Sequence, residues 1–242
     1  MTLKAVVLMA YVGMQAFAAK AEFREFTDTK GRTITAELIS YNALQEKVTI
    51  KLKGKGNKTI PIGIFSETDQ KYVVEWHRNQ DFLNSNKLVV SFNRCKKKNT
   101  DNSSSSWWFN RSYYDHSFSI KVENRSPVDF NDVELEYVIF YSQERHIKDW
   151  SDTKEEHGTL YVRKVISLPK KSTKEIETEN LLLVNVSSSG KPDLKGEILG
   201  IILNLSLKTE TGETISRRIK FPENLDHVWT PKTTDVQIPP AE

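Results

Sequence analysis

Apolar residues recur at every second position in short runs along most of this chain, and no other feature constrains its fold as strongly. The clearest run places apolar or aromatic side chains at Val133, Leu135, Tyr137, Ile139 and Tyr141. A period of two is that of a β-strand with one buried face, whereas a helix repeats about every 3.6 residues. We therefore predict a mainly β protein.

The first predicted domain spans residues 22–77 and consists of short strands followed by one helix. Two glycine-containing turns separate strands, and Pro61 marks the last strand as an edge strand or as the end of a strand. Ser66 followed three residues later by Asp69 is a typical helix start. Four short strands and one closing helix predict a small, half-open barrel. The helical face expected to point inward carries Tyr72, Val73 and Trp76.

A longer second domain, residues 87–225, is expected after a polar linker at 78–86. It lacks a long helical period, and turn signals separate its candidate strands, which is typical of a β-sandwich. Residues 226–242 are rich in proline and threonine and predict a flexible tail. The seven candidate strands are 87–93, 117–124, 132–142, 158–167, 172–184, 196–209 and 213–221.

The first residues have the pattern of an export signal. A lysine precedes the apolar run 5–18, and cleavage after Ala18 or after Ala21 fits the small residues that follow. The run is shorter than the roughly 20 residues that a membrane-spanning helix needs. We therefore predict a signal peptide at 1–21 and no stable membrane span after its cleavage. The expected location is the periplasm, the cell surface or the medium.

Charge and motif content argue against several classes of function. The chain has 35 basic and 32 acidic residues, for a formal net charge of +3, which is too balanced to indicate a nucleic-acid partner. Nucleotide-binding, zinc-protease and serine-hydrolase motifs are absent from the sequence. We therefore expect a protein that is not an enzyme and that needs no cofactor.

Cys95 is the single cysteine, so the chain can form neither an intrachain disulfide nor a cysteine-based zinc site. Histidine and carboxylate side chains that could ligate a divalent metal gather in residues 144–157. They are His146, Asp149, Asp152, Glu155, Glu156 and His157. Their spacing matches no known set of metal ligands. We expect a polar hairpin loop there and no metal site.

Residues 26–76 are similar to the Sla-one homology domain, which is an SH3-like barrel. The resemblance implies this fold for the first domain. It also implies binding of Asn-Pro-Phe-x-Asp peptides, which is the activity of the domain in the yeast endocytic adaptor of that family. Exported proteins of planctomycetes and verrucomicrobia carry similar domains after a signal peptide. The matching positions are Gly31, Arg32, Ala36, Glu37, Val48, Pro61, Phe65, Ser66, Asp69, Gln70, Tyr72, Val73 and Trp76.

Residues 121–141 resemble immunoglobulin-like extracytoplasmic domains in which two early strands flank an Asn-Ser-Pro turn. The resemblance implies a seven-stranded immunoglobulin-like β-sandwich for the second domain. With one cysteine, the chain lacks the disulfide of antibody domains.

Our first functional hypothesis is a protein-binding or adaptor module. As the family resemblance implies, the barrel would hold an extended peptide or protein segment in a groove beside the helix, with an aromatic-lined pocket for a ring. Two members of the candidate set, Tyr72 and Trp76, are equally compatible with the core. The candidate peptide-binding residues are Phe26, Tyr41, Phe65, Tyr72 and Trp76.

The alternative is a carbohydrate-binding or cell-envelope surface module. Residues 95–116 combine a lysine run, a serine run and several aromatic residues in an expected connection between strands. Trp107, Trp108 and Tyr113 are suited to stacking on the sugar rings of an envelope glycan. The competing interpretation is a flexible loop whose aromatic residues pack on the sandwich.

Six Asn-x-Ser/Thr triplets are potential acceptors of N-linked sugar. Such triplets arise easily by chance in a chain rich in asparagine and serine, and several lie on predicted strands. We therefore interpret them as chance occurrences and not as sugar acceptors. They begin at Asn57, Asn102, Asn110, Asn124, Asn185 and Asn204.

Overall fold

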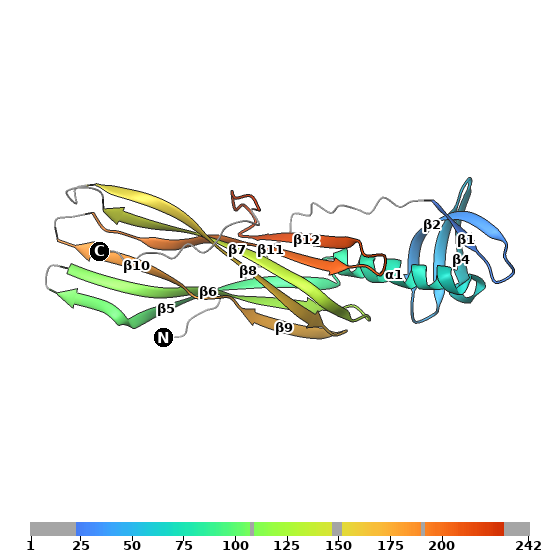
Figure 1. Cartoon of the computed structure of the whole chain (residues 1–242), viewed down its shortest axis with the longest axis horizontal. Coiled ribbons are helices and arrows are strands. Elements are labelled where there is room, and N and C mark those ends of the chain that lie inside the picture. The colour runs from blue at the N-terminus through green and yellow to red at the C-terminus, as the bar shows by residue number, and fades with distance from the viewer. Residues whose placement is uncertain (1–22, 107–108, 147–151, 190–191, 230–242) are drawn as a thin grey trace. The chain divides into compact units, whose positions relative to one another are not determined.

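The computed structural model describes residues 23–106, 109–146, 152–189 and 192–229 (Figure 1). These residues form antiparallel sheets and one α-helix, which confirms the predicted mainly β fold. They divide into two compact units. The N-terminal unit contains the described residues up to Leu88 together with Lys208–Ile215, and the C-terminal unit contains the rest.

An antiparallel sheet of four strands in the order β1-β2-β3-β4 forms one layer of the N-terminal unit. Gly31 and Gly54 provide the positive φ angles, 78° and 75°, that its tight turns require. The sheet is open, so its strands do not close into a barrel. The strands are β1 (Arg24–Thr27), β2 (Thr33–Asn42), β3 (Lys47–Leu52) and β4 (Lys55–Pro61).

Helix α1 (Glu67–Leu83) follows a short 3-10 helix, η1 (Ile62–Ile64). It begins where the sequence predicted, because the Ser66 hydroxyl accepts a hydrogen bond from the Asp69 amide. The prediction of a linker at 78–86 was wrong over its first part, since the helix continues to Leu83. The segment contains no glycine or proline to stop a helix, and Phe82 on the last turn is fully buried.

The core of the N-terminal unit joins the sheet to the helix. The rings of Phe26 and Phe65 lie 5.1 Å apart within it. Beside this core the buried carboxylate of Asp69 accepts hydrogen bonds from the Arg24 guanidinium at 2.8 Å and the Thr27 amide at 2.7 Å, which ties β1 to α1. The buried apolar members are Phe26, Ala36, Leu38, Val48, Ile50, Ile62, Phe65 and Val73.

Replacing Ser66 with alanine is expected to destabilise α1 by about 1 kcal/mol, because the Asp69 amide loses its capping acceptor. Hydrogen exchange of the first-turn amides of α1 measures this loss directly. Thr68→Ala is the matched control, since Thr68 is exposed on the same turn. Equal exchange rates in the two variants would contradict a capping role.

The described part of the C-terminal unit has eight strands in two antiparallel sheets. One sheet has the order β10-β6-β5, with β9 also paired to β6, and the other has the order β12-β11-β7-β8. The two-sheet, sandwich-like arrangement agrees with the sequence prediction. The strands are β5 (Leu88–Ser106), β6 (Phe109–Asn124), β7 (Phe130–His146), β8 (Thr153–Leu168), β9 (Ser172–Glu177), β10 (Leu181–Ser188), β11 (Gly196–Lys208) and β12 (Thr214–Phe221).

The predicted strand 172–184 is two strands, which accounts for eight in place of seven. Thr178 lies between β9 and β10, and its hydroxyl accepts a hydrogen bond from the Phe118 amide at 2.9 Å. The Thr178 amide in turn donates to the Phe118 carbonyl at 2.9 Å. β6 is therefore long enough to pair with β9 along one half and with β10 along the other.

The prediction of a loop at 95–116 was wrong, because β5 continues to Ser106 and β6 begins at Phe109. The two strands pair along this length, and the Asn99 side chain donates a hydrogen bond to Asp115 at 3.2 Å. The lysine and serine runs carry no apolar alternation to mark a strand. Main-chain pairing does not require such alternation where a strand faces water on its sides.

The described part of the predicted tail, residues 226–229, has no regular secondary structure but packs on the C-terminal unit. His227 lies with its ring 4.4 Å from that of Phe140, and Trp229 contacts Tyr161 edge to face. Aromatic contacts of this kind hold a segment on a sheet without a strand. The rest of the tail, and the predicted signal peptide at 1–21, lie outside the described residues.

Candidate functional site

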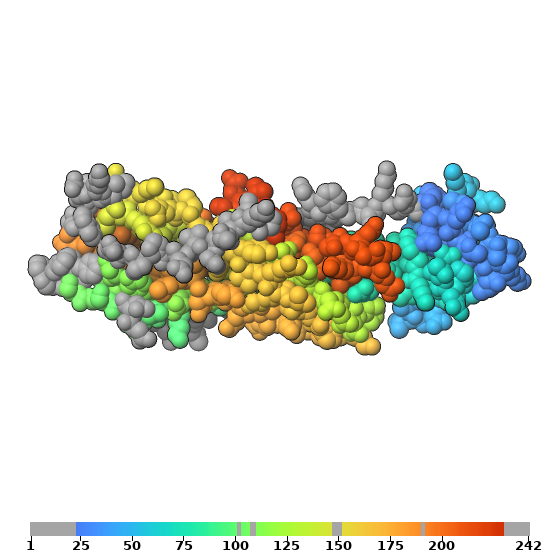
Figure 2. Space-filling view, viewed as in Figure 1, coloured from blue at the N-terminus to red at the C-terminus, as the bar shows by residue number. Residues whose placement is uncertain are grey.

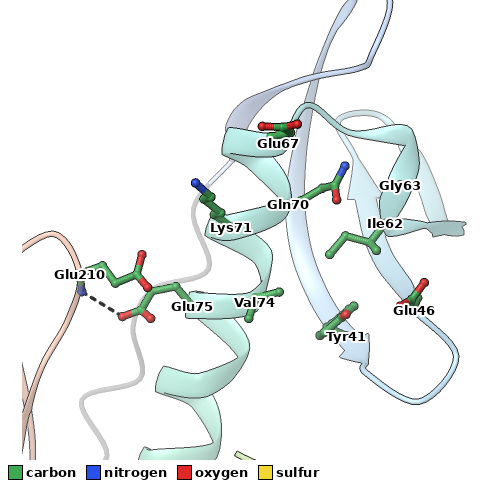
Figure 3. A pocket seen from close by; sticks show the side chains of 10 residues that line it. All are labelled: Tyr41, Glu46, Ile62, Gly63, Glu67, Gln70, Lys71, Val74, Glu75 and Glu210. Atoms are coloured by element: carbon green, nitrogen blue, oxygen red, sulfur yellow. Dashed lines mark hydrogen bonds between the residues drawn. The ribbon is translucent and has the colours of Figure 1, made fainter. Parts of the chain in front are cut away.

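A groove of about 480 Å³ in the N-terminal unit runs between α1 and the residues that join β2 to β3 and β4 to α1 (Figure 3). Its apolar lining comes from Tyr41 at the end of β2, Ile62 in η1 and Val74 on α1. Helix α1 lies at the surface of this unit (Figure 2, turquoise), and its groove residues Glu67 and Val74 are exposed to solvent. The charged residues that line it are Glu46, Glu67, Lys71, Glu75 and Glu210.

Local backbone structure holds the two walls of the groove in place. The Tyr41 ring lies edge to face against His77 of α1, with ring centres 5.4 Å apart. Glu46 has a positive φ angle of 51° in the β2–β3 turn, and its carbonyl accepts a hydrogen bond from the Ile62 amide at 2.8 Å. This hydrogen bond joins the β2–β3 turn to η1. It therefore fixes Tyr41 and Ile62 relative to each other on one wall of the groove.

Val74 presents an exposed apolar surface on the helical wall, with 46% of its side chain accessible. Val73 next to it is fully buried in the core. Two adjacent residues on a helix point about 100° apart, so Val74 can face solvent while Val73 faces the core. This pair of valines is the sequence signal that was available for the groove and that our interpretation missed.

The electrostatics of the groove are acidic. Burial, and then the negative charge of Glu46, raise the pKa of the Tyr41 phenol above its ordinary value. The Glu75 carboxylate lies 3.4 Å from the Arg78 guanidinium and accepts a hydrogen bond from the Glu210 amide at 3.1 Å. In the part of the chain that the structure describes, neither Glu46 nor Glu67 forms an ion pair.

Of the five residues predicted to bind a peptide, Tyr41 lines this groove. Phe26 and Phe65 do not, because both are core residues with exposed fractions of 0% and 1%. Tyr72 is exposed but lies elsewhere, with the Arg24 guanidinium 3.7 Å from its ring centre. Trp76 is partly buried against the core. Their placement in a binding groove was therefore wrong for the two phenylalanines, whose side chains fill the space between sheet and helix.

The predicted glycan-binding set is described only in part. Trp107 and Trp108 lie outside the described residues. Tyr113 on β6 is partly buried and packs against an apolar cluster formed by Val184, Val186 and Leu194. Carbohydrate binding therefore stays a prediction, with one of its three side chains engaged in packing.

His116 on β6 is a buried histidine in a basic environment. Burial, and then the positive charges of Lys96 and Arg94, lower its pKa to about 4, with Asp115 opposing them. A histidine whose folded pKa lies below its value of 6.5 in the unfolded chain stays neutral in the fold while the unfolded chain takes up a proton.

The C-terminal unit is therefore expected to lose stability as the pH falls from about 6.5 towards 4. His116→Gln should reduce this pH dependence, because glutamine does not titrate. Urea unfolding of both proteins at a series of pH values measures the effect, and an NMR titration of the imidazole gives the pKa itself. A His116 pKa at or above the ordinary value would contradict the prediction.

Other candidate sites of the sequence are not assembled. Among the described residues, no three or more histidine, cysteine, aspartate or glutamate side chains gather as metal ligands, and Asp149 lies outside them. His146 and His157 lie on paired strands, at the ends of β7 and β8. Cys95 on β5 is partly exposed, and its thiol lies 4.0 Å from the Asn93 carbonyl.

No helix in the described ranges is both long enough and apolar enough to cross a bilayer.

Among the Asn-x-Ser/Thr triplets whose asparagine has a described side chain, those at Asn124 and Asn204 begin at a buried residue. The Asn124 side-chain amide donates to the carbonyls of Val128, Leu168 and Pro169 at 2.9, 3.0 and 3.0 Å. Its oxygen accepts hydrogen bonds from Ser126. Asn124 therefore organises the turn between β6 and β7.

Comparisons with known proteins identify no family for this chain. No protein-family model matches the chain, and no curated protein matches it. A solved structure described as the ApaA protein of Bordetella pertussis is similar at 12% identity and a TM-score of 0.23, over 55% of this chain and 91% of that one. A second structural-genomics protein is similar at 12% identity and a TM-score of 0.22, over 60% of this chain and 96% of its own.

Proposed function

We propose that the N-terminal unit is a non-enzymatic protein-binding module that holds an extended segment of a partner protein in the groove beside α1. The groove itself is the observation that carries the proposal. It combines an exposed Val74 and a partly exposed Tyr41 with an open, polar rim. Shallow grooves lined by an aromatic ring and aliphatic side chains are a recurring means of peptide recognition.

The proposal includes the resemblance of the first domain to the Sla-one homology domain, which the sequence suggested. We propose that residues 23–77 are an SH3-like domain of the Sla-one homology type, in a protein exported by the signal at 1–21. Two observations support the proposed relationship. The unit has four strands followed by a helix that Ser66 caps, and a groove lies beside that helix. The role we infer is that of an adaptor outside the cytoplasm, with the C-terminal unit as its second module.

Two peptides test the function on the full-length chain. One contains Asn-Pro-Phe-Ser-Asp and the other Asn-Pro-Phe-Ser-Lys, and both are titrated while amide NMR shifts are recorded. We expect saturable binding of at least one peptide, with shifts around Tyr41, Ile62 and Val74. Because the groove is small, the Kd is expected to be roughly 10 µM to 1 mM.

Tyr41→Ala is expected to weaken that binding at least about fivefold, since buried aromatic anchors contribute most of the binding energy in small interfaces. Ile34→Ala is the matched control, because Ile34 is an exposed apolar residue of the same sheet strand and does not line the groove. The proposal would be wrong if neither peptide bound saturably. It would also be wrong if the Tyr41→Ala variant bound the peptide with the same affinity as the unchanged protein.

A further inference from the structure

Carboxylates dominate the rim of the groove in the N-terminal unit. Glu46, Glu67 and Glu75 line it together with a single lysine, Lys71, apart from Glu210 in the turn after β11. Glu75 is already next to Arg78, at 3.4 Å. Glu46 and Glu67 are exposed and, within the described residues, have no cationic partner.

Lys71 does not neutralise this rim. It lies four residues after Glu67 and four before Glu75 on α1, and no ion pair links it to either residue in the described part of the chain. Exposed helical pairs at this spacing are weak when they form, and one lysine among four glutamates leaves a net negative charge on the lining of the groove. Burial is the larger cause of the raised pKa of Tyr41, and the negative charge of Glu46 adds to it.

The arrangement of apolar and acidic side chains in the groove indicates which ligand side chains it can bind. Figure 3 shows Ile62 between Glu67, at the start of the helix, and Glu46, in the β2–β3 turn. An apolar side chain that packs on Ile62 and Val74 would thus have a free carboxylate on either side. A lysine or arginine next to that side chain would meet an opposite charge, whereas an aspartate would meet a like charge.

We propose that the occupant of the groove is an extended protein segment in which an apolar side chain is flanked by lysine or arginine. This inference rests on the proposed function and specifies its ligand. It departs from the aspartate-bearing peptides that the family resemblance implies.

The same two peptides decide between the ligand classes, since they differ only in the final aspartate or lysine. At 50 mM salt the lysine peptide is expected to bind the full-length chain about five- to twentyfold more tightly. The difference should shrink to about twofold at 0.5 M salt, because exposed charges are then screened.

Charge variants of Glu46 test whether the groove is the source of the preference for the lysine peptide over the aspartate peptide. Glu46→Gln should weaken the lysine peptide about two- to fivefold and leave the aspartate peptide unchanged or slightly tighter. Glu46→Lys should reverse the order of the two peptides. Glu25→Gln is the control, because Glu25 is an exposed carboxylate of β1 that does not line the groove. Amide NMR spectra confirm that each variant is folded.

Tighter binding of the aspartate peptide in the groove would overturn this inference and leave the proposed function standing. A preference for the lysine peptide that survives in Glu46→Lys would also overturn it, because the charge would then act elsewhere. Failure of both peptides to bind would overturn the proposed function together with the inference.

Discussion

Phe65→Ala is expected to destabilise the N-terminal unit by about 3–5 kcal/mol, the largest effect of any substitution considered in it. Phe65 has an exposed fraction of 1%, and its ring packs against Phe26 with centres 5.1 Å apart. Removing the ring leaves a cavity between sheet and helix that the surrounding strands cannot fill. Small domains have only about 5–15 kcal/mol of total stability, so a large share of the folding free energy is lost.

Hydrogen exchange of the β2 and β3 amides measures this loss without interference from the C-terminal unit. Tyr72→Ala is the control, because Tyr72 is an exposed aromatic residue that contacts Arg24 through its ring face. We expect a cost of about 1 kcal/mol for that variant. If Phe65 were a groove residue, its alanine variant would keep native exchange rates and lose only peptide binding.

Asn124→Ala is expected to destabilise the C-terminal unit by about 2–4 kcal/mol. The Asn124 side chain is fully buried, and the carbonyls of Val128, Leu168 and Pro169 all accept hydrogen bonds from it. Alanine leaves these carbonyls and the Ser126 amide without their partner in a site that excludes water. A buried polar group that loses its hydrogen bond costs about 1–3 kcal/mol.

Urea unfolding followed by near-UV circular dichroism measures the effect. Asn110→Ala is the matched control, since Asn110 also begins an Asn-x-Ser triplet but is exposed on β6. Its substitution is expected to change the stability by less than about 0.5 kcal/mol. Equal stability of the two variants would show that Asn124 does not organise the β6–β7 turn.

Features set by short stretches of sequence could be predicted. The alternation in residues 133–141 appears as β7, whose side chains from Val133 to Tyr141 include most of the buried residues of that strand. The Ser66–Asp69 pair appears as the cap of α1, and Gly31 has the positive φ angle of a tight turn. Each of these depends on a residue and its near neighbours, because backbone sterics, capping and strand alternation act over one to four positions.

The extent of the strands was less predictable. Residues 95–106 carry no alternation, yet they form the second half of β5, because pairing with the neighbouring strand β6 uses main-chain groups and does not depend on the side chains. The helix likewise extends into the predicted linker as far as Leu83, because burial of Phe82 stabilises its last turn. In both cases the length of the element depends on packing or pairing with another part of the fold, which the pattern of apolar residues along the element does not reveal.

The sequence by itself determined the class of the protein: alternating strands, a single capped helix and one cysteine allow a mainly β chain stabilised by burial. Only the tertiary structure decided which aromatic residues are core and which line a groove. Phe65 and Tyr41 are both aromatic residues near strand ends, but one packs on Phe26 and the other on His77. The acidic groove likewise joins Glu46 to Val74, which lie far apart along the chain, because burial and charge depend on which surfaces meet in space.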